Sequence, residues 1–375
     1  MVKQRQIMLK PVKYILMIAI FTVLSVGTVW GQFTVQEDVL YATHDGVPLY
    51  GDLYLPATAG PHPAMMFIHG GAWQVGSKSA YGVSWGPYLA ERGYVVFSID
   101  YRLSSATDHT WPEALLDCKA ALQYLRGNAA TLDVDPDRIG VGGDSAGGQL
   151  SSMLTLTQDW PAFANQYPSD IFADESTKVK VEVAAYGVFN MPSWWMWNKN
   201  PDFDFGFLTR TFLEDLFGGT PEDLPAPYFE ASAINYVRAS AKSLGEVSLP
   251  NAGMEVPWFI TYGLDDFDVP AEGQSIPFVK ALKEAGADVT AVAVPGAGHY
   301  WFTFTEITGK RGIPDCVTVF SPELVVICSG ATPNDFIAKK LLRFLDKNLA
   351  FANGGHDGYH HGDHDGYHHG DHHDD

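Results

Sequence analysis

The feature that most restricts the fold of this chain is the stretch Val141-Gly142-Gly143-Asp144-Ser145-Ala146-Gly147-Gly148. Its core, Gly143-x-Ser145-x-Gly147, is typical of a turn so tight that only hydrogen side chains fit on either side of the serine. Residues 137–142 before it predict a short buried strand, and residues 149–156 after it predict a helix. A strand, a sharp turn and a helix in that order lift the serine hydroxyl clear of a sheet, as a nucleophile requires.

The rest of the chain alternates strand and helix patterns. Strands are predicted at residues 37–43, 49–55, 63–68, 94–99, 137–142, 179–185, 257–262 and 289–294, and helices at 81–92, 111–128, 149–156 and 278–284. The first two strands form a hairpin around Asp45-Gly46, a favoured turn pair. Short connections between the later elements predict an α/β fold whose central sheet is mostly parallel, with helices on both faces.

A second glycine loop, His69-Gly70-Gly71-Ala72-Trp73, directly follows the strand at 63–68. Attack by a serine turns an ester or amide carbonyl into an oxyanion, which needs N–H groups already directed at it. Gly71, Ala72 and Ala146, the residue after the serine, are the predicted donors of an oxyanion hole. Taken alone, the loop also fits an ordinary strand-to-loop turn, and we interpret His69 as a structural residue of that loop.

Two further side-chain types follow later strands. Asp265, Asp266 and Asp268 come after the strand ending at Tyr262, and His299 comes after the strand ending at Val294. Functional groups of such a sheet gather at the carboxyl ends of its strands. The order serine, acid, histidine is that of the hydrolases built on this turn, so His299 is the predicted base, while the choice of acid stays open.

From about residue 45 to 350 the chain resembles α/β-hydrolase esterases, above all the feruloyl and acetyl-xylan esterase-like carboxylesterases (BD-FAE-like) and more distantly the hormone-sensitive-lipase group. The resemblance rests on five motifs in the same order: His69 to Trp73, Asp100-Tyr101-Arg102-Leu103-Ser104, Gly143 to Gly148, Gly263 to Pro270, and Gly296-Ala297-Gly298-His299. It implies a catalytic triad of Ser145, Asp266 and His299, with Asp268 as the second choice of acid. The lipase group usually has a third glycine at the position of Ala72, so this loop is closer to the esterase branch.

The resemblance implies carboxylesterase chemistry through an acyl-enzyme, without a metal or an organic cofactor. The expected substrates are small-molecule or carbohydrate-linked esters, such as acetyl or feruloyl esters. Trp73 and Trp301 adjoin the catalytic loops and are expected to bind substrate, and aromatic residues are dense in a predicted insert at about 187–240, over the active site. Packing within the insert is the other interpretation of these aromatic residues.

Residues 1–31 carry basic residues ahead of an apolar run from Tyr14 to Val26. The run is shorter than the roughly 20 residues of a membrane span, which favours a cleaved signal peptide over an uncleaved membrane anchor and predicts a secreted protein, periplasmic or extracellular. Residues 32–352 are then the hydrolase domain. The net charge of -20 argues against nucleic acid as a partner.

The last segment, residues 353–375, is rich in His and Asp and has almost nothing apolar to bury. It is predicted to be a disordered tail, either solubilising only or able to bind divalent metal weakly. Cys316 and Cys328 are predicted to pair in an oxidising compartment, and Cys118 to be a buried free thiol. Two other function classes remain from the sequence: a serine peptidase of the same fold, and a non-catalytic, metal-binding secreted protein.

Overall fold

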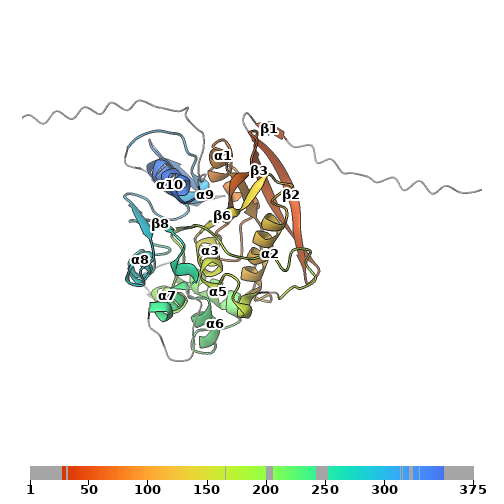
Figure 1. Ribbon diagram of the computed structural model, residues 1–375. Helices are drawn as coiled ribbons and strands as arrows, with labels where there is room; N and C mark the ends of the chain where they lie inside the picture. Colours follow the sequence, from red (N-terminus) through yellow and green to blue (C-terminus); the bar gives the residue numbers. More distant parts are fainter. Residues whose placement is uncertain are drawn as a thin grey trace, which may run out of the picture.

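The computed structural model describes residues 28–30, 33–164, 166–199, 206–241, 252–312, 314, 316–320, 324–328 and 330–349 (Figure 1). Its strands are β1 (Thr28–Trp30), β2 (Phe33–His44), β3 (Val47–Pro56), β4 (His62–Ile68), β5 (Val95–Ile99), β6 (Val134–Asp144), β7 (Glu182–Ala185), β8 (Trp258–Gly263), β9 (Val289–Val294), β10 (Cys316–Phe320) and β11 (Leu324–Cys328). Its helices are α1 (Trp85–Ala90), α2 (Glu113–Gly127), α3 (Ala146–Thr157), α4 (Met191–Trp197), α5 (Gly206–Phe217), α6 (Pro225–Glu230), α7 (Ala233–Ala241), α8 (Ser275–Glu284), α9 (Trp301–Phe304) and α10 (Pro333–Leu349).

Nine strands form one sheet in the order β1-β2-β3-β5-β4-β6-β7-β8-β9. The first three are antiparallel, and the strands from β5 to β9 in this order pair in parallel. The predicted α/β fold with a mostly parallel sheet is therefore confirmed. Parallel strands need helical crossovers, and these place helices on both faces of the sheet.

The alternation of side chains along β4 shows how the two faces are filled. Met66 and Ile68 belong to the apolar cluster that contains α2, α3 and α8, whereas Met65 and Phe67 belong to the cluster that contains α1 and α10. Successive strand residues point to opposite faces, so a strand buried on both sides is apolar throughout. Every residue of β4 is buried.

Three element boundaries illustrate where the structure differs from the prediction. The helix expected from Tyr81 begins at Trp85, because Tyr81 is instead the last residue of a short 3-10 helix, Lys78–Tyr81. β7 covers only Glu182–Ala185, whereas β6 starts earlier, at Val134. The segment between β7 and β8 forms α4 to α7, and α5, α6 and α7 gather below α3 in the view of Figure 1.

The predicted signal peptide and tail lie outside the described residues, apart from Thr28–Trp30, which pairs with β2 as β1. No helix in the described part of the chain has both the length and the apolar character to span a bilayer. β10 and β11 form a separate antiparallel ribbon in which Cys316 and Cys328 are register partners. Cross-strand Cα atoms lie about 4.5–5.5 Å apart, within the range that a disulfide spans. Cys118 is free and buried.

Candidate functional site

The serine turn connects the end of β6 to the start of α3. Ser145 has φ 53° and ψ −119°, a conformation that L residues adopt only when the surrounding structure enforces it. Packing explains the flanking glycines: a Cβ on Gly147 would lie 1.9 Å from the carbonyl oxygen of Ile68, and one on Gly143 would lie 2.3 Å from that of Gly147. Larger residues at these positions would push α3 away from β4.

The structure brings Ser145, His299 and Asp266 together at the carboxyl ends of β6, β9 and β8. Nε2 of His299 lies 2.9 Å from Oγ of Ser145, and Nδ1 of His299 lies 2.7 Å from Oδ2 of Asp266. The other oxygen of Asp266 accepts the backbone N–H groups of Asp268 (3.1 Å) and Val269 (2.9 Å), which fix the carboxylate. The result is one continuous hydrogen-bonded chain from hydroxyl to carboxylate, with the imidazole in the middle.

His299 is buried among carboxylates. Burial, the largest single effect, lowers the pKa of its imidazole, but Asp266, Asp268 and Asp144 together outweigh it, so that the pKa is raised above its ordinary value. Burial also raises the pKa of Asp268. A neighbouring negative charge stabilises the imidazolium that forms when a histidine accepts a proton. The surroundings of His299 therefore suit a general base.

Asp144, Tyr81 and Tyr186 support this site, and the sequence analysis did not single them out. Oδ1 of Asp144 accepts the Gly70 N–H (3.0 Å) and the Tyr81 hydroxyl (2.8 Å). The Tyr186 ring packs 4.4 Å from the His299 ring, and its hydroxyl oxygen accepts the N–H of Phe302 at 2.9 Å. Asp144 lies inside the serine motif and Tyr186 directly follows a strand, which are the only sequence signals for them.

The loop after β4 has the backbone that an oxyanion hole needs. Gly71 has φ +113° and Ala72 has φ 52°. Within the described residues, the N–H groups of Gly71, Ala72 and Ala146 make no hydrogen bond outside regular elements, whereas the carbonyl of Gly71 accepts the N–H of Gln74 and Val75 (both 3.0 Å). Ala146 is the first residue of α3, where helix N–H groups have no intrahelical partner. These three donors are thus available to a ligand.

His69 and the two tryptophans are buried in the protein interior. The His69 ring stacks on Tyr101 (4.4 Å) and burial lowers its pKa to about 4, so it stays neutral as a structural residue. Trp73 is 0% exposed and donates its indole N–H to Gln149 (3.1 Å), and Trp301 is 1% exposed. Both indoles, which the sequence analysis expected to bind substrate, pack in the core in this structure.

Among the described residues, no group of three or more His, Cys, Asp or Glu side chains could hold a metal ion. The His- and Asp-rich tail lies outside those residues.

Comparison with known proteins identifies relatives of this chain. Residues 51–246 match the BD-FAE family. The chain is 31% identical over 242 residues to esterase LipC of Mycobacterium tuberculosis, covering 64% of this chain and 53% of the relative. It is 34% identical over 267 residues to a probable isoprenylcysteine alpha-carbonyl methylesterase, ICMEL2, of Arabidopsis thaliana, covering 71% and 57%. The chain spans about half the length of the curated relatives it matches.

Solved structures show the same fold. A truncated carbohydrate esterase from gut microbiota is 26% identical, with a TM-score of 0.55, over 73% of this chain and 92% of that chain. Esterase Est2 of Thermogutta terrifontis is 24% identical, with a TM-score of 0.57, over 85% of this chain and 95% of that chain. At this level of identity the likeness concerns the fold only.

Proposed function

Because the chain belongs to the BD-FAE family, we propose that it is a carboxylic-ester hydrolase in which Ser145 is the nucleophile, His299 the general base and Asp266 the residue that orients the base. The observation that carries this proposal is the hydrogen-bonded chain from the Ser145 hydroxyl through both imidazole nitrogens to the Asp266 carboxylate. A serine hydroxyl is a weak nucleophile unless a base in this position removes its proton.

The reaction proceeds in two acyl transfers. Oγ of Ser145 attacks the ester carbonyl while its proton moves to Nε2 of His299, and the N–H groups of Gly71, Ala72 and Ala146 bind the oxyanion. The imidazolium then protonates the departing alcohol, which leaves an acyl-serine. Water, deprotonated by His299, attacks this ester and releases the carboxylic acid, with the proton returning to Ser145. No step requires a cofactor.

The proposed substrates are small-molecule or carbohydrate-linked esters with an acetyl or feruloyl acyl group. The support is the resemblance to esterases of this type, together with a carbohydrate esterase among the structural neighbours. The aromatic insert gives less support than its composition implies. Phe189, Trp194 and Trp195 are buried, in line with packing, whereas Trp197 is 38% exposed and could stack on a ring.

Secretion is part of the same proposal and rests on the basic and apolar pattern of residues 1–31. A disulfide between Cys316 and Cys328 agrees with export, and the register of β10 and β11 supports it. The tail is proposed to bind divalent cations weakly through imidazole and carboxylate groups. Fractionation of expressing cells and N-terminal sequencing of the exported protein test the secretion proposal.

The decisive experiment on the activity is Ser145→Ala, assayed with p-nitrophenyl acetate. We expect hydrolysis to fall to the background rate and labelling by a serine-reactive fluorophosphonate to disappear, with unchanged circular dichroism. Turnover that persists in this variant would refute the assignment. A panel of acetyl, feruloyl and longer-chain esters then identifies the preferred acyl group, and a peptide anilide identifies any peptidase activity.

A further inference from the structure

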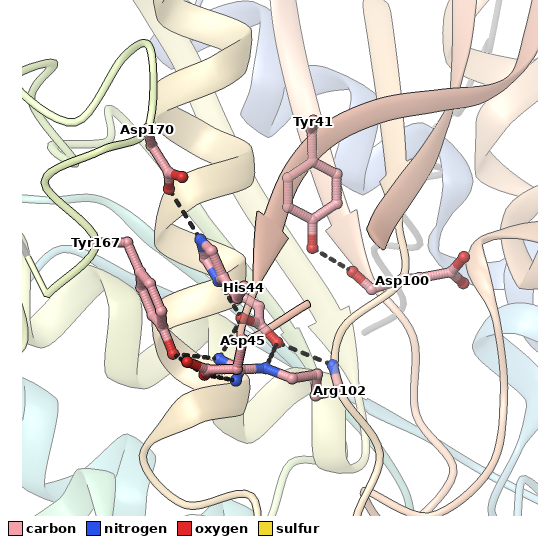
Figure 2. Close-up of polar contacts among 8 residues, drawn as sticks. Tyr41, His44, Asp45, Asp100, Arg102, Tyr167 and Asp170 are labelled. Atoms are coloured by element: carbon pink, nitrogen blue, oxygen red, sulfur yellow. Dashed lines mark hydrogen bonds and ion pairs between the residues drawn. The ribbon is translucent and has the colours of Figure 1, made fainter. Parts of the chain in front are cut away.

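A second histidine is held between two carboxylates, far along the chain from the triad. His44 lies at the turn from β2 to β3, fully buried. Its Nδ1 is 2.6 Å from Oδ1 of Asp117 on α2, and its Nε2 is 2.8 Å from Oδ2 of Asp170. The ring stacks on Tyr167, with centroids 3.6 Å apart and planes within 5°. Figure 2 shows the imidazole beside Asp170 and Tyr167.

The two contacts favour a charged ring. A neutral imidazole has one N–H, so one of its nitrogens would present a lone pair to a carboxylate oxygen, whereas an imidazolium donates to both. Burial, the largest single effect, lowers the pKa of His44, but Asp117 and Asp170 together raise it above its ordinary value. Arg102 and Asp45 are the other charged groups of the cluster, since Arg102 bonds to both Asp45 and Asp117.

Three more titratable groups lie near this cluster. Burial raises the pKa of both Tyr41 and Cys118, with Asp117 as the next contributor in each case. Burial likewise raises the pKa of Asp100, whose backbone carbonyl accepts the Tyr41 hydroxyl at 2.6 Å (Figure 2). Two side chains touch Asp117 directly, His44 and Arg102. Against the effect of burial, the carboxylate of Asp117 raises the pKa of both and so favours their charged forms.

Asp117 also binds Arg102, in the segment after β5. It accepts three hydrogen bonds from Arg102: from Nε (2.8 Å), from a terminal nitrogen (2.8 Å) and from the backbone N–H (3.0 Å). One carboxylate therefore joins the β2–β3 turn, α2 and the 101–104 segment. Because His44 shares an oxygen with Arg102, the position of this carboxylate depends on both cations.

The 101–104 segment in turn holds the loop that carries two of the proposed oxyanion donors. The Tyr101 hydroxyl donates to the carbonyl of His69 (3.0 Å), and the backbone N–H (2.7 Å) and hydroxyl (3.1 Å) of Ser104 donate to the carbonyl of Trp73. His69 and Trp73 are the two ends of the loop that contains Gly71 and Ala72. Both ends are thus fixed by a segment that Asp117 anchors.

We infer that charged His44 is a positioning residue for the oxyanion loop, so that loss of its proton loosens this loop and lowers kcat with little change in KM. The inference rests on the proposed ester hydrolysis. Deprotonation of His44 therefore lowers kcat, whereas deprotonation of His299 raises it, because His299 must be unprotonated to act as a base. Since the folded pKa of His44 is raised above its unfolded value, its stabilising contribution is complete below about pH 6.5 and is lost as the pH rises through the folded pKa.

The test compares His44→Gln and Asp170→Asn with His109→Gln as a matched control. The His109 ring meets the backbone carbonyl of Asp215 (2.6 Å) and takes part in no ion pair of the described residues. For each protein, kcat and KM for p-nitrophenyl acetate, the thermal midpoint and the NMR titration of the histidine Cε1–H signals are measured from pH 5 to 10.

The wild type and His109→Gln should lose kcat about tenfold at alkaline pH, because displacing a catalytic group by about 1 Å costs up to about 100-fold. Asp170→Asn should keep kcat near the wild-type maximum without this decline, because an amide can accept from the charged ring and donate to the neutral one. His44→Gln should also lack the decline, at a lower kcat. A wild-type decline that survives in both variants would overturn the inference.

A lack of esterase activity in the wild type would count against the proposed function alone. In that case the thermal midpoint and the NMR titration still test the contacts of His44 with Asp117 and Asp170. Wild-type stability should fall with the deprotonation of His44, and Asp170→Asn should abolish that fall. If the His44 signal titrates below pH 6.5, the inference is overturned whatever the activity.

Discussion

The carboxylate of Asp266 contacts Nδ1 of His299 at 2.7 Å, whereas the backbone N–H of Asp268, two residues later, donates to the same Asp266 side chain. Asp266 thus contacts the histidine, whereas Asp268 helps to fix the Asp266 side chain. Two N–H donors on one carboxylate oxygen leave the other oxygen free for the imidazole. This geometry separates two residues that the sequence places in one crowded loop.

Replacing Asp266 with Asn should lower kcat by about 10⁴-fold, because the amide favours the wrong imidazole tautomer and gives no charge to the imidazolium. Asp268→Asn is the matched control, with the same chemical change two residues away, and should lower kcat far less, because Asp268 contacts the Asp266 carboxylate through its backbone N–H, which the change leaves in place. Steady-state kinetics with p-nitrophenyl acetate measure both. Equal losses in the two variants would mean that the geometry has been misassigned.

Replacing Gly147 with Ala should prevent the serine turn from forming, because the new Cβ would lie 1.9 Å from the backbone carbonyl oxygen of Ile68, in a strand that is paired on both sides. We expect a thermal midpoint lowered by several degrees, for a cost of more than about 2 kcal/mol, and loss of activity. Gly330→Ala is the control, since no atom lies within 4 Å of its added Cβ. Wild-type melting of Gly147→Ala would contradict this account.

Glu182, on β7, is fully buried under α3 and accepts the hydroxyls of Ser151 (2.6 Å) and Thr155 (2.9 Å). Burial raises its pKa from 4.5 to about 8. Between these two values the unfolded chain loses this proton and the folded chain keeps it, so stability falls as the pH rises, by up to about 1.4 kcal/mol per pH unit.

Glu182→Gln should remove that dependence, because an amide does not titrate. Denaturant unfolding at pH 5 and pH 8 should show the variant gaining stability relative to the wild type at the higher pH. Asp288→Asn, at an exposed surface ion pair, is the control and should leave the slope unchanged. If the stability of Glu182→Gln depended on pH as steeply as that of the wild type, Glu182 would not be the group that causes this dependence.

The Cys316–Cys328 disulfide should be present in protein purified from an oxidising compartment. Mass analysis of alkylated protein, with and without prior reduction, should show two cysteines that become accessible only after reduction, while Cys118 reacts only on unfolding. Removing the bridge with Cys328→Ser should lower stability by about 2–3 kcal/mol, as expected for a short loop. Alkylation of both cysteines in unreduced, folded protein would exclude the bridge.

Local sequence patterns were sufficient for eight strands of the main sheet, β2 to β9, and for the serine turn and the order of the triad residues. Apolar runs such as residues 63–68 identify a doubly buried strand without reference to the rest of the chain, since burial on both faces leaves no polar position. The glycines around Ser145 predict the turn because steric exclusion there is a property of adjacent residues. The rule that active groups follow parallel strands then placed Ser145 and His299 at one edge.

Long-range packing decided the rest. Asp266 is distinguished from Asp268 by where its side chain points, and Trp73 and Trp301 lie in the core although they are neighbours of catalytic loops. The partners of His44 are 73 and 126 residues away along the chain. No local pattern encodes such a contact, because hydrogen bonds and burial depend on distances in space, which only the folded chain sets.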